Sequence, residues 1–166
     1  GRGITVFRYK NEVIRDCLTK AGSLFEYYTY KTALQCERDG VPLYDSATTG
    51  IILGWNEDVD STRNEIDVML MKNLTPIFIS CKNGEIGEED LYKLNTVASR
   101  FGGKYARKML VATDLQRKSA SSVRAFLQRA KDMGIYVVQD HKQAEYWLQK
   151  AVESSDPDAV AEARKE

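Results

Sequence analysis

The amino-acid sequence predicts an α/β fold in which a mixed central β-sheet is flanked by helices. Three observations support this prediction. A long stretch with apolar residues at helical spacing comes first, three apolar strand-like runs follow close together, and helical and strand-like segments then alternate along the second half. Closely spaced strands form antiparallel meanders, whereas a strand–helix–strand crossover makes its two strands parallel, so we expect both kinds of pair in one sheet.

The first half of the chain supplies the helical region and the meander. Residues 4–8 alternate in the way of a short strand, and residues 11–38 follow a helical pattern that Gly22 kinks or divides. Gly40, Pro42 and Asp45 mark a break. The three strands of the meander are then expected at residues 49–55, 63–71 and 75–81, with a polar loop at 56–62 and a turn at 72–73.

The second half alternates helices and strands. A helix is expected at residues 88–100, closed by the glycines at 102 and 103. Another begins at a cap on Ser119 or Ser121 and stops at Gly134. Strands are expected at 108–113 and 135–139, and a last helix at 144–152.

Composition fits one globular domain of 166 residues, of which 43% are hydrophobic. No apolar run approaches the roughly 18 residues of a membrane span, and no signal-peptide pattern is present. Cys17, Cys36 and Cys81 are odd in number and lack CxxC spacing, so we expect reduced, buried thiols in a cytoplasmic protein. Because the chain begins with Gly1 and not with Met, we expect residues 1–166 to be a piece of a longer protein.

Charge is distributed unevenly although the formal net charge is zero. Acidic residues cluster in 57–67 and 85–90, whereas 104–131 is rich in lysine and arginine. A basic face beside an acidic pocket would attract phosphates to one surface and divalent cations to the other, although an ordinary solvated helix face explains the charges equally well. The basic residues expected to contact nucleic acid are Lys104, Arg107, Lys108, Arg117 and Lys118.

The residues most informative about chemistry lie on the second and third predicted strands. Since side chains alternate along a strand, Glu65 and Asp67 share one face, and Ser80 and Lys82 share a face of the next strand. A turn at 72–73 would bring Asp67 and Lys82 together. Such charges are costly to bury unpaired, so they need each other, a metal or a substrate; a plain cross-strand ion pair is the simplest alternative. The opposite face of the second strand is expected to hold Ile66, Val68 and Leu70.

A helix, a three-strand meander, and then an acid and a lysine on neighbouring strands together resemble the core of PD-(D/E)XK nucleases, a restriction-endonuclease-like αβββαβ fold. The resemblance covers residues 11–139. Residues 64–67, 78–84, 91–94 and 101–103 are similar more narrowly to the nuclease domain of CRISPR ancillary proteins, in which it follows a CARF domain that senses cyclic oligoadenylate.

The resemblance implies a metal-dependent endonuclease that cleaves DNA or RNA in antiviral defence. Asp67, Glu26 and the backbone carbonyl of Cys81 would hold Mg²⁺ or Mn²⁺. Lys82 would orient the attacking water or stabilise charge on the phosphate. The resemblance further implies a homodimer, a C-terminal position in the full protein, and activation by cyclic oligoadenylate bound to a CARF domain that this chain lacks.

Ser80 departs from the family pattern, which has Asp or Glu at that position. Either Glu65 or Glu26 replaces the missing carboxylate, which we prefer, or the site is weakened. The weakened site predicts the alternative function, a non-cleaving nucleic-acid-binding module of the same fold. A dimerisation scaffold for a missing regulatory domain is a third possibility.

Two further features have an ordinary structural interpretation. Tyr27, Tyr28 and Tyr30 could stack on bases, but their helical spacing favours the core. His141 follows a predicted strand far in sequence from the acidic cluster, and we expect an ordinary surface residue.

Overall fold

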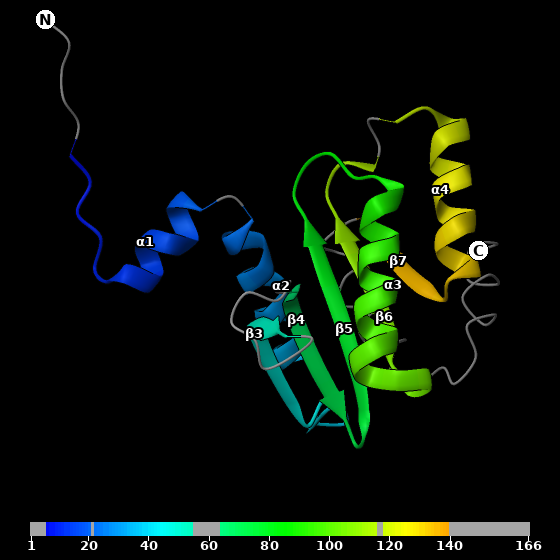
Figure 1. Cartoon of the computed structure of the whole chain (residues 1–166). Helices are drawn as coiled ribbons and strands as arrows, with labels where there is room; N and C mark the ends of the chain where they lie inside the picture. The colour runs from blue at the N-terminus through cyan, green and yellow to red at the C-terminus, as the bar shows by residue number, and fades with distance from the viewer. Residues whose placement is uncertain (1–5, 21, 55–63, 116–117, 140–166) are drawn as a thin grey trace, which may run out of the picture.

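The computed structural model describes residues 6–20, 22–54, 64–115 and 118–139. A five-stranded mixed sheet forms the centre, with strand order β3-β4-β5-β6-β7 (Figure 1). The strands are β3 (Ser46–Leu53), β4 (Asn64–Lys72), β5 (Thr75–Lys82), β6 (Arg107–Ala112) and β7 (Ile135–Val138). The first three are antiparallel neighbours, and β5, β6 and β7 are parallel. The predicted meander and the predicted crossovers are both confirmed.

The helices cover both faces of this sheet. Helix α2 (Ser23–Gln35) lies on one face, and α3 (Glu88–Gly102) and α4 (Ala120–Asp132) lie on the other (Figure 1). Helix α1 (Glu12–Thr19) contacts α2 and projects away from the sheet. A one-turn 3₁₀ helix, η1 (Gly103–Tyr105), follows α3. The fold is therefore the predicted α/β class, and its core elements follow the order αβββαβ.

Local sequence explains where the helices begin and divide. The region predicted as helical over 11–38 divides at Gly22, whose φ of 92° suits glycine and breaks the helix. Asn11 caps α1 by accepting from the backbone N–H of Ile14 at 2.9 Å, and Ser119 caps α4 by accepting from that of Ser122 at 3.2 Å.

Some expected boundaries differ from those observed. The helical pattern stops at Gln35, and a two-residue hairpin of β1 (Glu37–Arg38) and β2 (Val41–Pro42) occupies the expected break. Residues 6–8 are not a strand, and β3 begins three residues earlier than expected. The expected loop at 56–62, the expected helix at 144–152, Arg117 and His141 lie outside the described residues.

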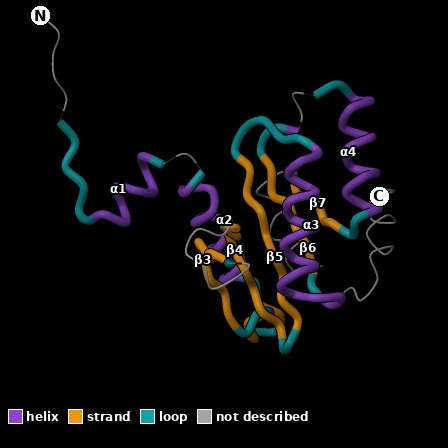
Figure 2. Tube along the Cα trace, in the orientation of Figure 1, coloured by secondary structure: helices purple, strands orange, loops and turns teal. Residues whose placement is uncertain are grey.

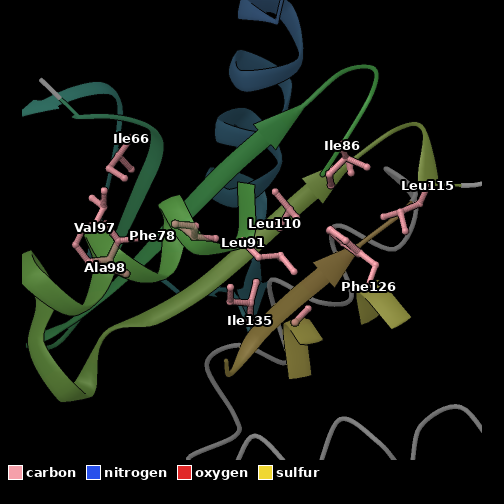
Figure 3. Close-up of a cluster of buried hydrophobic side chains, with 13 residues drawn as sticks. Ile66, Phe78, Ile86, Leu91, Val97, Ala98, Leu110, Leu115, Phe126 and Ile135 are labelled. Carbon is pink, nitrogen blue, oxygen red and sulfur yellow. The ribbon is translucent and has the colours of Figure 1, made fainter. Parts of the chain in front are cut away.

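Two hydrophobic cores sandwich the sheet. One packs α2 against residues that include Leu70, Ile79 and Met109. The other packs α3 and α4 against the opposite face and is drawn in Figure 3 with Phe78, Leu110 and Ile135. Within the described ranges, no helix has the length and apolar character needed to cross a bilayer.

Candidate active site

A pocket of about 200 Å³ lies between the β4 and β5 strands and the first turns of α3. It contains three carboxylates, two lysines and one serine beside three apolar side chains. Four of the predicted catalytic residues, Glu65, Asp67, Ser80 and Lys82, therefore lie together. The complete lining is Glu65, Ile66, Asp67, Ser80, Lys82, Asp90, Lys93, Leu94 and Val97.

At this pocket β4 changes the face that it presents to the helices. Residues two apart share a face in a regular strand, yet Ile66 packs in the core beneath α3 (Figure 3), whereas Val68 and Leu70 pack in the core beneath α2. The expectation that these three residues share one face is wrong. Pairing between β4 and β5 also ends here, with Val68 opposite Ile79.

Asp67 spans the gap where the two strands stop pairing. Its Oδ2 accepts the backbone N–H of Cys81 at 2.6 Å and the hydroxyl of Ser80 at 3.1 Å. No hydrogen bond to Oδ1 comes from any other described residue. The carboxylate is thus held in one orientation, with one oxygen left for a ligand in the pocket.

Lys82 is held from the opposite wall by Asp90, a residue that the sequence interpretation missed. Its ammonium lies 3.0 Å from Asp90 Oδ1, while Asp90 Oδ2 accepts the backbone N–H of Gly87 at 2.9 Å. Burial lowers the pKa of Lys82, but the hydrogen bond and charge of Asp90, with smaller contributions from Asp67 and Glu89, outweigh it and leave the pKa raised. Lys82 is therefore a cation in this pocket.

Glu26 does not line the pocket, but the charged groups of the pocket shift its pKa. Burial, and then the negative charges of Asp67 and Glu65, raise the pKa of Glu26, and Lys82 opposes the shift. Glu26 comes from α2, on the other face of the sheet from α3. Carboxylates from α2 and β4 therefore approach the same region from different elements.

Cys81 presents its side chain to the α2 face and its backbone to the gap. The thiol packs beside Thr29, 3.5 Å from its hydroxyl, and burial raises the pKa of Cys81 to about 12. The side chain is therefore a protonated thiol and not a thiolate ligand. A backbone N–H and C=O of one strand residue point to the same neighbouring strand, so the carbonyl of Cys81 faces the gap together with the N–H that Asp67 accepts.

The donors near the gap suit a hard divalent cation. Asp67, Glu65, Glu26 and the Cys81 carbonyl offer oxygen atoms, which are the ligands that Mg²⁺ and Mn²⁺ prefer. Burial is the largest cause of the raised pKa of Glu26, and the negative charges of Asp67 and Glu65 add to it, so a cation would relieve that repulsion. In the part of the chain that is described, no three His, Cys, Asp or Glu side chains form a metal-binding group by themselves. A metal here would complete its shell with water and backbone oxygen.

The predicted nucleic-acid-binding residues that the structure describes do not form one face. Arg107 and Lys108 begin β6, and Lys104 precedes them in η1; Arg107 is about 16 Å along the strand from Ala112, which pairs with Lys82. The ammonium of Lys108 is occupied by Asn95 Oδ1, at 2.8 Å, and by the carbonyl of Met133. Lys104 lies over the ring of Tyr105.

Lys118 lies at the other end of β6. That end joins the pocket side of the sheet, because Thr113 donates to the carbonyl of Lys82 at 3.1 Å and to Asn83 Oδ1 at 3.0 Å. Figure 2 shows the β5–α3 loop and the loop after β6 at this same edge. A continuous basic segment in the sequence is thus split between two ends of the sheet.

The tyrosines of α2 are only partly in the core. Tyr30 packs against the core beneath α2, as the helical spacing predicts. Tyr27 and Tyr28 are 46% and 45% exposed, so the core interpretation is wrong for these two.

Residues 9–154 match the family model described as Card1-like, endonuclease domain. Two solved structures have a similar fold: protein VC1899 from Vibrio cholerae, with a TM-score of 0.67, and Can2 from Sulfobacillus thermosulfidooxidans in complex with cyclic tetra-adenylate (cA4), with a TM-score of 0.63. Sequence identities are 23% and 21%, covering 87% and 89% of this chain but only 36% and 40% of those proteins. No curated protein sequence matches the chain. The chain spans well under half the length of either structural neighbour.

Proposed function

The chain belongs to the Card1-like endonuclease domain family, and on this premise we propose that it is a metal-dependent endonuclease that hydrolyses phosphodiester bonds of DNA or RNA. One observation carries the proposal: Asp67 and Lys82, from strands that have stopped pairing, line the same pocket. A carboxylate and a cation facing one cavity can serve a divalent ion and a phosphate together.

In this proposal Asp67 is the principal metal ligand, because Oδ2 is fixed by two hydrogen bonds and Oδ1 is left to bind. The carbonyl of Cys81, Glu26 and Glu65 supply further oxygen donors. A bound Mg²⁺ or Mn²⁺ would polarise the scissile phosphate and lower the pKa of the attacking water. Lys82, held as a cation by Asp90, orients that water or stabilises the negative charge that grows on the phosphate.

Ser80 has an orienting role in this arrangement. It stands where the family has an acid, and its hydroxyl donates to Asp67 at 3.1 Å. A serine is a weak ligand for Mg²⁺ but a good donor to a carboxylate that is one. Glu65 lines the same pocket and supports the view that a neighbouring acid replaces the missing carboxylate.

We further propose that the full protein acts in CRISPR antiviral defence as a homodimer and is switched on by a cyclic oligoadenylate bound to a CARF domain outside this chain. The fold similarity to Can2, whose structure contains cyclic tetra-adenylate, supports this proposal. So does the small share of that protein that this chain spans, which leaves room for a sensor domain.

Labelled single- and double-stranded DNA and RNA, incubated with the purified chain and Mg²⁺ or Mn²⁺, test the proposal. We expect cleavage that EDTA stops, that Asp67→Asn abolishes and that Lys82→Ala reduces to a slow residual rate. Asp132→Asn is the matched control, because it makes the same chemical change on the exposed side of α4 and should cleave like the wild type. Metal-dependent cleavage that survives Asp67→Asn would overturn the assignment.

A non-cleaving binding module is the second candidate, and Ser80 is the observation that favours it. It predicts salt-dependent binding of nucleic acid without turnover under any of these conditions. It also predicts that Ser80→Glu gains cleavage activity.

A further inference from the structure

The pocket contains a second lysine, Lys93, to which the reaction above gives no role. Both Lys82 and Lys93 line the pocket together with Glu65 and Asp67. The two ammonium groups differ in their surroundings, and that difference assigns them different tasks.

Lys82 is already matched by a negative charge. Asp90 lies 3.0 Å from its ammonium, and the other oxygen of Asp90 is tied to the backbone of Gly87. Lys93 lies one helical turn after Asp90, is exposed, and has no carboxylate of the described residues within ion-pair distance. It is therefore the lysine of this pocket whose charge is left for an incoming anion.

The position of Lys93 is fixed by its helix. Leu91 and Leu94 on either side of it are buried, at 0% and 3% exposure, so α3 cannot rotate without exposing them. The first turns of α3 are also tied to α4, because Arg129 donates to Glu88 at 2.7 Å and to the hydroxyl of Tyr92 at 2.8 Å. A rigid helix thus presents a flexible cation at the pocket wall.

The charge of the pocket favours such a cation at its wall. Its lining has three carboxylates, on Glu65, Asp67 and Asp90, against two lysines, which leaves one net negative charge before any metal binds. The carboxylates repel a nucleic-acid backbone that enters this field, so the divalent cation and Lys93 both favour binding, and each phosphate contact releases about one counterion.

On the basis of the function proposed above, we propose that Lys93 binds a backbone phosphate of the nucleic-acid strand and so seats the strand in the pocket. Lys93 is then a substrate-binding residue that acts on affinity, whereas Lys82 acts at the reacting phosphate. The ligand class is a phosphodiester of any base sequence, since a lysine reads a phosphate as a point charge.

Binding measured without cleavage tests this assignment. The probe is a fluorescent oligonucleotide titrated with wild type, Lys93→Gln, Lys93→Arg and Lys31→Gln in Ca²⁺ or EDTA, over a series of salt concentrations. Lys31 is an exposed lysine on α2 outside the pocket and controls for the loss of one positive charge. Thermal melts confirm that each variant is folded.

We expect Lys93→Gln to weaken binding about fivefold to tenfold at low salt and to reduce the slope of log K against log salt by about 0.7 to 0.9, the value of one phosphate contact. Lys93→Arg should restore both quantities. In cleavage assays the loss should fall on KM, with kcat close to wild type.

A slope for Lys93→Gln equal to that of Lys31→Gln overturns the inference, even where the wild type cleaves. A wild type that binds through Lys93 but never cleaves leaves the inference standing and overturns the proposed function. A wild type that neither binds nor cleaves overturns both.

Discussion

Replacing Asp90 with asparagine should slow cleavage about tenfold while leaving substrate affinity nearly unchanged. The substitution keeps the shape of the side chain and an oxygen for the N–H of Gly87. It removes the charge beside Lys82, and the new amide turns a donor toward an ammonium that can only donate. The defect should therefore appear as a misplaced Lys82 and not as a broken helix.

The size of the expected rate loss follows from how far Asp90 and Lys82 are buried. A hydrogen bond to a charged group contributes about 1.5–3 kcal/mol when neither partner is screened. Asp90 is 14% exposed but Lys82 is 34% exposed, so water screens this pair and the lower figure applies. About 1.4 kcal/mol corresponds to a factor of about ten in rate.

Single-turnover cleavage by Asp90→Asn, Lys82→Ala and the double variant measures the coupling. If Asp90 acts only through Lys82, the double variant should be no slower than Lys82→Ala alone. Losses that multiply, or a wild-type rate for Asp90→Asn, would refute the coupling. Asp132→Asn provides the charge-matched control, and a melting curve tests whether the cap on Gly87 survives.

Other residues give predictions of the same kind. Asp67→Asn should abolish cleavage, because it removes the principal metal ligand, whereas losing a partner that only orients such a ligand typically costs about 10–100-fold; it should also abolish any Mn²⁺-dependent rise in Tm. Ser80→Ala removes one of the two hydrogen bonds to Asp67 and should slow single-turnover cleavage about tenfold, the low end of that range, because the N–H of Cys81 still holds the carboxylate. Glu26→Gln should raise the Tm in EDTA at pH 7. Burial, and then Asp67 and Glu65, raise the pKa of Glu26, so ionisation of this carboxyl costs stability above the usual glutamate pKa of about 4.3. In melts repeated at lower pH, the difference in Tm between Glu26→Gln and the wild type should disappear. Leu110→Ala, at a fully buried position on β6, should lower the free energy of unfolding in urea by about 2–5 kcal/mol.

Much of the architecture follows from sequence periodicity. The alternation along β5 places Ser80 and Lys82 toward α3 and Cys81 toward α2, as period two requires. The crossover through α3 makes β5 and β6 parallel, as a helical connection requires. These features depend on local patterns that hold wherever the strand is regular.

The features missed depend on irregular or distant contacts. Nothing in the sequence marks the change of face between Ile66 and Val68, because both are apolar and either core accepts them. Asp90 could have been found as an acid in the first turn of a helix after Gly87, but its pairing with Lys82 exists only once α3 packs across β5. The basic residues of 104–131 do not form one surface, because β6 lies within this segment and separates its two halves to opposite ends of the sheet.

The end of pairing between β4 and β5 creates the candidate site. A ladder continued beyond Val68 and Ile79 would use the N–H and C=O of Cys81 for pairing with β4, and no backbone oxygen would be left for a ligand. Separation of the strands costs those hydrogen bonds, and Asp67 offsets part of the cost by accepting the Cys81 N–H itself. The same contact fixes the carboxylate beside the carbonyl of Cys81. The group that stabilises the opened sheet is therefore the group best placed to hold a cation in the opening, so the stability of the gap and its chemistry depend on one side chain.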